Sequence, residues 1–183
     1  MITMENIFNN IFVSYHGIGD YDFIKLKSIL EHGILPNIML PNIIPRNTLM
    51  GNTDTKVYLV ISPNIVGEKN ATAYRSYIKN GFGIVVNRFP NEPTYNIKQA
   101  FPDAGILEGP IFPNDFLGIT VPKEIYFKKI KDLSLELVNS TNLANDELTV
   151  KDLIASININ KLPIYDADTG YIIDCCKDKN MKK

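Results

Sequence analysis

The chain has 183 residues, of which 45% are hydrophobic and 21% charged, and its formal net charge at pH 7 is −1. This composition is typical of one globular domain, and the near-neutral charge argues against a broadly basic surface for nucleic acid. No stretch approaches the roughly 20 apolar residues that cross a bilayer, so we expect no membrane association.

The cysteines and the first ten residues indicate a compartment. The two cysteines, Cys175 and Cys176, are adjacent, which rules out a disulfide framework and offers no metal-ligand spacing. Residues 1–10 carry no basic side chain and do not look like a signal peptide. We therefore expect a cytoplasmic protein, or one delivered into a host cytoplasm, without a bound metal.

The first half of the chain alternates strand and helix patterns. In chain order they predict a strand over residues 11–16, a helix from Phe23 that ends at Gly33, a long proline-rich loop over 36–55, a strand over 57–62, and a helix over 70–81 with Asn70 as its N-cap. A loop as long as 36–55 is usually functional or mobile in a compact domain.

The second half contains shorter apolar runs. They predict strands over 82–86, 105–108 and 117–121, a second proline-rich loop over 89–103, an edge strand over 124–128, one or two short helices from about residue 132 that include a segment over 148–157 capped by Thr149, and a frayed tail from about 177. With no repeat and no linker, residues 1–183 are expected to form one α+β domain.

A candidate site begins where the first strand ends, at Tyr15-His16-Gly17. A glycine at this place lets a ligand or another backbone come close. An apolar strand with Tyr58, a helix with Tyr74 and Tyr77, and a late acidic residue follow in that order.

In this order of residues, the segment 11–126 resembles the diphtheria-toxin-like and poly-ADP-ribose-polymerase-like, or His-Tyr-Glu, branch of the ADP-ribosyltransferase superfamily. Ile18 stands where that family usually has threonine. The resemblance implies a split, mostly antiparallel sheet flanked by short helices. It also implies that NAD is the substrate and that ADP-ribose passes to an acceptor, which we expect to be a protein chosen by the loops 36–55 and 88–103.

The chemistry of NAD cleavage explains these residue types. The bond from ribose to the cationic nicotinamide breaks through an oxocarbenium-like transition state, and a carboxylate stabilises the developing positive charge. The resemblance gives this role to Glu108, with Asp103 as the alternative acid. It also implies that His16 forms a hydrogen bond with the adenosine ribose and that the backbone beside Gly17 lies near the nicotinamide amide.

The tyrosines are the expected walls of the nicotinamide site. Tyr58 and Tyr74 would hold the ring by stacking, with Tyr77, three residues further along the same helix, as the competitor of Tyr74. Ser62 follows the second strand, where it either contacts ligand or turns the chain. Each of these tyrosines also fits a role in the apolar core.

Two other functions stay open. The first is RNA 2′-phosphotransfer to NAD on the same fold, although the late strands show no clustered basic residues for a 2′-phosphate. The second is a non-catalytic binding or inhibitor module that keeps the fold, because a fold alone does not determine function.

Overall fold

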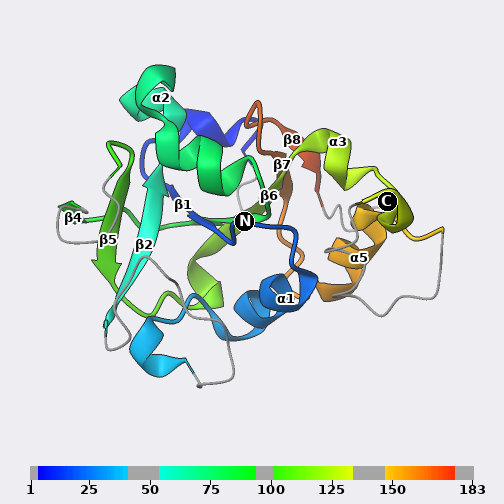
Figure 1. The fold of residues 1–183 in the computed structure, drawn as a ribbon, viewed down its shortest axis with the longest axis horizontal. Helices are drawn as coiled ribbons and strands as arrows, with labels where there is room; N and C mark the ends of the chain where they lie inside the picture. Colours follow the sequence, from blue (N-terminus) through cyan, green and yellow to red (C-terminus); the bar gives the residue numbers. More distant parts are fainter. Residues whose placement is uncertain (1–3, 41–53, 94–100, 134–146, 176–183) are drawn as a thin grey trace, which may run out of the picture.

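The computed structural model describes residues 4–40, 54–93, 101–133 and 147–175, and it contains one eight-stranded sheet of order β4-β5-β2-β1-β3-β6-β7-β8 (Figure 1). All neighbouring strands are antiparallel except β6 and β7, which are parallel. The strands are β1 (Ser14–Gly17), β2 (Lys56–Ile61), β3 (Gly83–Val86), β4 (Glu92–Pro93), β5 (Ala104–Glu108), β6 (Phe116–Val121), β7 (Ile164–Asp166) and β8 (Ile172–Asp174). The expected α+β class with a mostly antiparallel sheet is confirmed.

The helices are short. The α-helices are α1 (Phe23–His32), α2 (Pro63–Val66), α3 (Lys123–Tyr126) and α5 (Val150–Ile157), and η4 (Tyr74–Ile78) is a single π-helical turn. The 3₁₀ turns are η1 (Ile7–Asn9), η2 (Asn37–Met39), η3 (Glu68–Asn70), η5 (Pro113–Asp115) and η6 (Ile130–Asp132). Within the described residues, no helix has the length and apolar character needed to cross a bilayer.

The two faces of the sheet are covered by different helices (Figure 1). On one face, α1 and α5 pack on apolar residues such as Ile84 and Ile119. On the other face, η1 and η4 pack on residues such as Tyr15 and Val85. Because side chains alternate along a strand, neighbouring residues of β1 and β3 belong to opposite faces.

The sheet consists of two wings that are joined by a short ladder. The β2 wing contains β4, β5 and β2, and the β1 wing contains β1, β3, β6, β7 and β8. Five residue pairs join β2 to β5 and four join β1 to β3, whereas only Ser14↔Ile61 and Tyr15↔Val60 join β1 to β2. Beyond Tyr15 the β1–β2 ladder ends, and we call this place the β1–β2 gap.

Local signals explain the helices that the sequence predicted correctly. Asp22 caps α1 by accepting from the Lys25 amide at 3.0 Å, and Gly33 ends it with a φ of +99°. A side chain at Gly33 would also meet the Ile111 carbonyl oxygen, 2.5 Å from the position of its Cβ. Thr149 and Asp152 form a reciprocal capping box at the start of α5, so the predicted cap is confirmed.

Other expectations were wrong. The predicted edge strand over 124–128 begins instead as helix α3, because the Lys123 amide donates to the Asp166 carboxylate and the Tyr126 amide to the Pro122 carbonyl, each at 3.0 Å. Asn70 lies in η3 rather than capping a helix over 70–81. The strands β7 and β8, of three residues each, were not predicted at all.

Some predicted segments lie outside the described residues. These are most of the loop 36–55, half of the loop 89–103, most of the helical segment after residue 132, and the tail from 177.

Candidate functional site

His16 occupies the β1–β2 gap. Its Nδ1 atom lies 3.0 Å from the Tyr58 carbonyl oxygen on β2. This carbonyl lies beyond the last β1–β2 pair, so the ladder offers it no β1 amide. A carbonyl can only accept, which means that Nδ1 carries the proton and donates it. The imidazole therefore takes the place of a ladder hydrogen bond where the ladder ends.

The electrostatic surroundings keep this imidazole neutral at pH 7. Burial lowers the pKa of His16, and the positive charge of Lys25 lowers it further, while the hydrogen bond to the Tyr58 carbonyl opposes them. In the neutral ring with a proton on Nδ1, the Nε2 atom is a hydrogen-bond acceptor. His16 thus offers one acceptor that the fold does not require.

Gly17 follows at the end of β1, where its lack of a side chain admits a neighbouring backbone. A Cβ at this position would lie 2.6 Å from the Tyr77 carbonyl oxygen and 2.8 Å from the Tyr77 Cβ. The close approach that the sequence suggested is therefore made by η4. Any other residue at position 17 would push η4 away from the sheet.

A row of three aromatic rings runs along the η4 side of the gap. Tyr58 and Tyr77 meet edge to face, with ring centroids 6.2 Å apart, and Tyr77 meets Phe101 in the same way at 5.8 Å. Tyr58 is only 5% exposed, and its buried hydroxyl has no hydrogen-bond partner. Burial raises the pKa of Tyr58, so this hydroxyl is a neutral, unsatisfied polar group.

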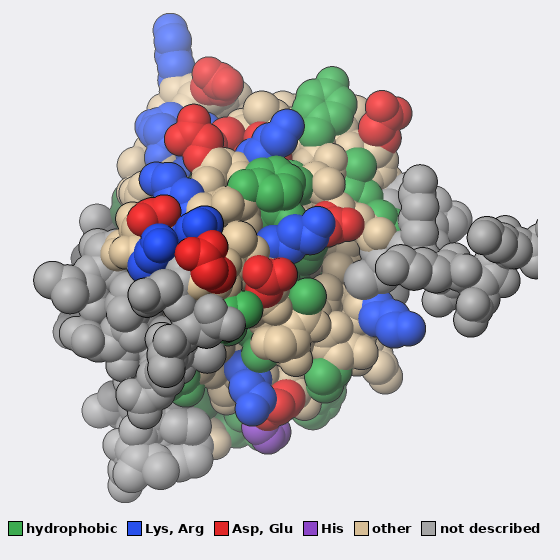
Figure 2. Space-filling view, turned by 90° about the vertical axis from the view of Figure 1, so that its right-hand side faces the viewer, with side chains coloured by type: hydrophobic (Ala, Val, Ile, Leu, Met, Phe, Trp, Pro, Cys, Tyr) green, Lys and Arg blue, Asp and Glu red, His purple; other side chains and the backbone are tan. Residues whose placement is uncertain are grey.

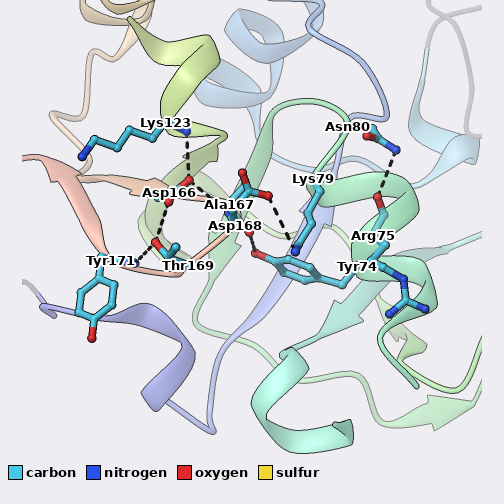
Figure 3. Close-up of polar contacts among 10 residues, drawn as sticks. All are labelled: Tyr74, Arg75, Lys79, Asn80, Lys123, Asp166, Ala167, Asp168, Thr169 and Tyr171. Atoms are coloured by element: carbon cyan, nitrogen blue, oxygen red, sulfur yellow. Dashed lines mark hydrogen bonds and ion pairs between the residues drawn. The ribbon is translucent and has the colours of Figure 1, made fainter. Parts of the chain in front are cut away.

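Tyr74 lies in the core rather than at the gap. It is 0% exposed, its ring meets Phe8 and Tyr15 edge to face at 5.5 and 5.2 Å, and its hydroxyl donates to the Ala167 carbonyl at 2.8 Å (Figure 3). Tyr77, which is only partly buried, is the middle ring of the aromatic row, between Tyr58 and Phe101. Of the two competing tyrosines, the structure therefore places Tyr77 beside Gly17 and Tyr58.

Asp103 is a buried carboxylate bound by the backbone of the neighbouring helix. Its Oδ1 accepts from the Ala73 amide and its Oδ2 from the Tyr74 amide, both at 2.8 Å, and the residue is 0% exposed. Its negative charge also raises the pKa of Tyr58. Asp103 thus caps the helical segment that contains η4, from a position thirty residues away in the chain.

Glu108 is the exposed candidate acid, at the end of β5. It pairs with Lys56, whose ammonium lies 2.6 Å from the carboxylate of Glu92. Tyr58 pairs with Ile106, so Glu108 is a diagonal neighbour of Tyr58 on the same face of the sheet. Unlike Asp103, its carboxylate is accessible to a ligand.

Ser62 has a local role. It is fully buried at the end of β2, and its hydroxyl oxygen accepts from the Asn64 amide at 3.4 Å as the N-cap of α2. This contact accounts for a polar residue between a strand and a helix.

At the end of the β1–β2 ladder, the structure places Gly17, Tyr58 and Tyr77 on the η4 face of the sheet. His16 pairs with Ile84 and lies on the α1 face, where it reaches the Tyr58 carbonyl at the edge of β2. Tyr74, Ser62 and Asp103 are hydrogen-bonded elsewhere in the fold. Sequence reasoning missed Phe101, an aromatic residue directly before Pro102. Its one signal was its position just before a candidate acid. Among the described residues, no group of three potential metal ligands occurs.

Two further surface features complete the description. A hollow of about 460 Å³ beside the β7–β8 turn is lined by Lys123, Glu124, Phe127, Asp166, Asp168 and Thr169. Figure 2 shows that acidic and basic side chains are intermixed on the face it displays. Surface ion pairs include Lys151–Asp174 and Lys129–Glu147.

Comparison of the chain with models of known protein families, with curated proteins and with solved structures gave no match.

Proposed function

We propose that this protein binds NAD at the β1–β2 gap and transfers its ADP-ribose to a protein acceptor. The observation that carries the proposal is the hydrogen bond between the His16 imidazole and the Tyr58 carbonyl where the β1–β2 ladder ends, with Gly17 and Tyr77 in contact beside it on the η4 face. A sheet whose wings share two residue pairs also agrees with the split, mostly antiparallel sheet of the resemblance. The His-Tyr-Glu order along the chain supports the same reading.

The state of His16 suits a sugar hydroxyl. Its Nδ1–H is held by the Tyr58 carbonyl, which leaves Nε2 as an acceptor. A ribose hydroxyl is a donor, and a neutral imidazole accepts from it without adding positive charge near a cationic substrate. His16 would bind the adenosine ribose in this way.

The aromatic row suits a flat, cationic ring. Tyr77 is partly buried, as is Phe101, and it lies beside Gly17 at the gap. A cation on an aromatic face gains about 0.5–2 kcal/mol, depending on how far water is excluded. We assign the nicotinamide contact to Tyr77 and Tyr58.

The reaction needs one accessible carboxylate. When the ribose–nicotinamide bond breaks, its electron pair passes to the ring nitrogen, so nicotinamide leaves neutral and the ribose carbon becomes positive. A nucleophilic atom of the acceptor then bonds to that carbon and loses its proton. We assign charge stabilisation to Glu108, because it is exposed on the face that carries Tyr58, whereas both oxygens of Asp103 already accept backbone hydrogen bonds.

Release of nicotinamide from NAD tests this proposal. We expect the wild-type protein to release it, and Glu108→Gln to be slower by about 10²–10³-fold with little change in NAD affinity. Glu92→Gln is the matched control, since Glu92 is also an exposed carboxylate beside Lys56 and should keep its activity. Full activity in Glu108→Gln would contradict the assignment of the acid, and a wild type without turnover would contradict the enzyme.

A second candidate is a non-catalytic binding module on the same fold. The favouring observation is that Tyr74 and Asp103 are bonded within the fold and that the open side of Gly17 is filled by η4. A wild-type protein that binds NAD or a protein partner without releasing nicotinamide would favour this module.

A further inference from the structure

The helical turn η4 spans the two wings of the sheet. One of its ends is bonded to the residue that precedes β5, in the β2 wing, and its side chains reach the β7–β8 turn, in the β1 wing. Between these contacts, its backbone lies against Gly17 at the β1–β2 gap.

The anchor in the β2 wing is Asp103. Its carboxylate binds the amides of Ala73 and Tyr74 at 2.8 Å each, and its own carbonyl accepts from the Ile61 amide at 2.7 Å. Asp103 therefore connects the start of η4 to β2 and β5 at once. Both amides belong to a first helical turn, which has no internal acceptors for them.

The anchor in the β1 wing is Tyr74, whose hydroxyl donates to the Ala167 carbonyl in the β7–β8 turn (Figure 3). This turn is itself rigidly bonded. The Asp166 carboxylate accepts from the Lys123 amide at 3.0 Å and from the Thr169 hydroxyl at 2.6 Å. A longer ion pair of 3.8 Å from Lys79 to Asp168 reaches the same turn.

The π-helical turn begins at Tyr74, the residue whose amide and hydroxyl contact the two wings. The Lys79 amide donates to the Tyr74 carbonyl five residues back, at 3.1 Å. Single π turns are rare and occur often at functional sites. The wider turn lets Tyr74 point into the core while Tyr77, three residues later, meets Tyr58 at the gap.

We propose that Asp103 and Tyr74 are positioning residues: they fasten η4 to both wings and thereby set the separation of β1 and β2 at His16. Each acts through η4 and touches no substrate. The role of Asp103 and Tyr74 in holding η4 follows from their hydrogen bonds, and its consequence for NAD binding rests on the proposed function.

The hydrogen bond from His16 to the Tyr58 carbonyl reports on this separation, because it spans the gap. It fixes the neutral ring with the proton on Nδ1, whereas a histidine released into water prefers the proton on Nε2. NMR of the imidazole nitrogens distinguishes the two forms. The chain has only two histidines, so His32→Gln assigns the signals.

The test compares three variants at a pH where His16 is neutral and at a temperature where each is folded. In Tyr74→Phe and in Asp103→Asn, we expect loss of the Nδ1–H form at His16 and gain of the Nε2–H form. Tyr126→Phe is the matched control, because it also removes a tyrosine hydroxyl bond, 2.9 Å from Asp174, but at β8. It should keep the wild-type form even if its thermal midpoint falls.

An unchanged His16 in Tyr74→Phe would overturn the proposal, and so would an equal change in Tyr126→Phe. If Asp103→Asn does not fold, Tyr74→Phe decides the outcome. NAD titrations of the same proteins separate the two proposals. A wild type that does not bind NAD counts against the proposed function, while the tautomer change still decides the role of the anchors.

Discussion

The two tyrosines of η4 lie three residues apart and have opposite surroundings. Tyr74 has a hydrogen-bonded hydroxyl, two aromatic neighbours and no exposed surface. Tyr77 lies at the gap next to Tyr58, whose hydroxyl is buried without a partner. Buried polar groups are nearly always bonded, so an exception is either a cost of the fold or a place for a ligand. The Tyr15 hydroxyl beside Tyr74 is a second such exception, so the two ends of η4 differ in the bonding and exposure of their own tyrosines.

The largest loss of stability is expected when the hydrogen bonds at the Tyr74 end of η4 are removed. Asp103→Ala leaves two buried amides of the first helical turn without an acceptor, which should lower the free energy of unfolding by about 3 kcal/mol. Urea denaturation measures this change. Asp115→Ala, which removes an exposed ion pair with Arg88, is the control and should cost less than about 1 kcal/mol. Equal losses in both variants would contradict the anchoring role of Asp103.

A smaller difference in stability is expected between two variants that each lose one tyrosine hydroxyl. Tyr74→Phe removes a bonded hydroxyl and leaves the Ala167 carbonyl unpaired, at a cost of about 1–2 kcal/mol. Tyr58→Phe removes a buried hydroxyl that has no partner, so it should leave the stability unchanged or raise it. Thermal unfolding of the two variants side by side makes the comparison. A larger loss in Tyr58→Phe would mean that the gap end is also a closed part of the core.

The sequence could predict the elements whose signals are local, and it could not predict those that depend on distant residues. The cap residues Asp22 and Thr149 and the C-cap Gly33 act within a few residues of their helices, and the helices that they flank were predicted correctly. The strands with strong apolar runs were predicted for the same reason. Their signals are local.

The features that failed depend on distant partners. Helix α3 forms where Asp166, more than forty residues away, accepts from the Lys123 amide. The strand β7 has three residues and is held by its parallel pairing to β6. The preference for Tyr74 over Tyr77 ignored the π turn, whose first residue is hydrogen-bonded to Asp103 and Ala167. No spacing within residues 70–81 carries that information.

The sequence predicted which residues belong to the candidate site better than it predicted the contacts that they make. His16 and Tyr58 do meet, through an imidazole–carbonyl bond that no pattern indicated. The two acids differ in accessibility, since Asp103 is buried under η4 and Glu108 is the exposed last residue of β5. Whether an acid caps a helix or faces solvent is decided by tertiary structure.

The most direct test of the central claim is a calorimetric titration of NAD into the wild type, His16→Ala and His32→Ala. The two histidines form a natural pair, because both donate to a backbone carbonyl through Nδ1, but His32 lies exposed on α1. We predict that the wild type and His32→Ala bind NAD equally, and that His16→Ala binds about 5- to 30-fold more weakly, as expected for one lost hydrogen bond of about 1–2 kcal/mol. Equal affinity in all three proteins, or no binding to the wild type, would contradict an NAD site at the β1–β2 gap.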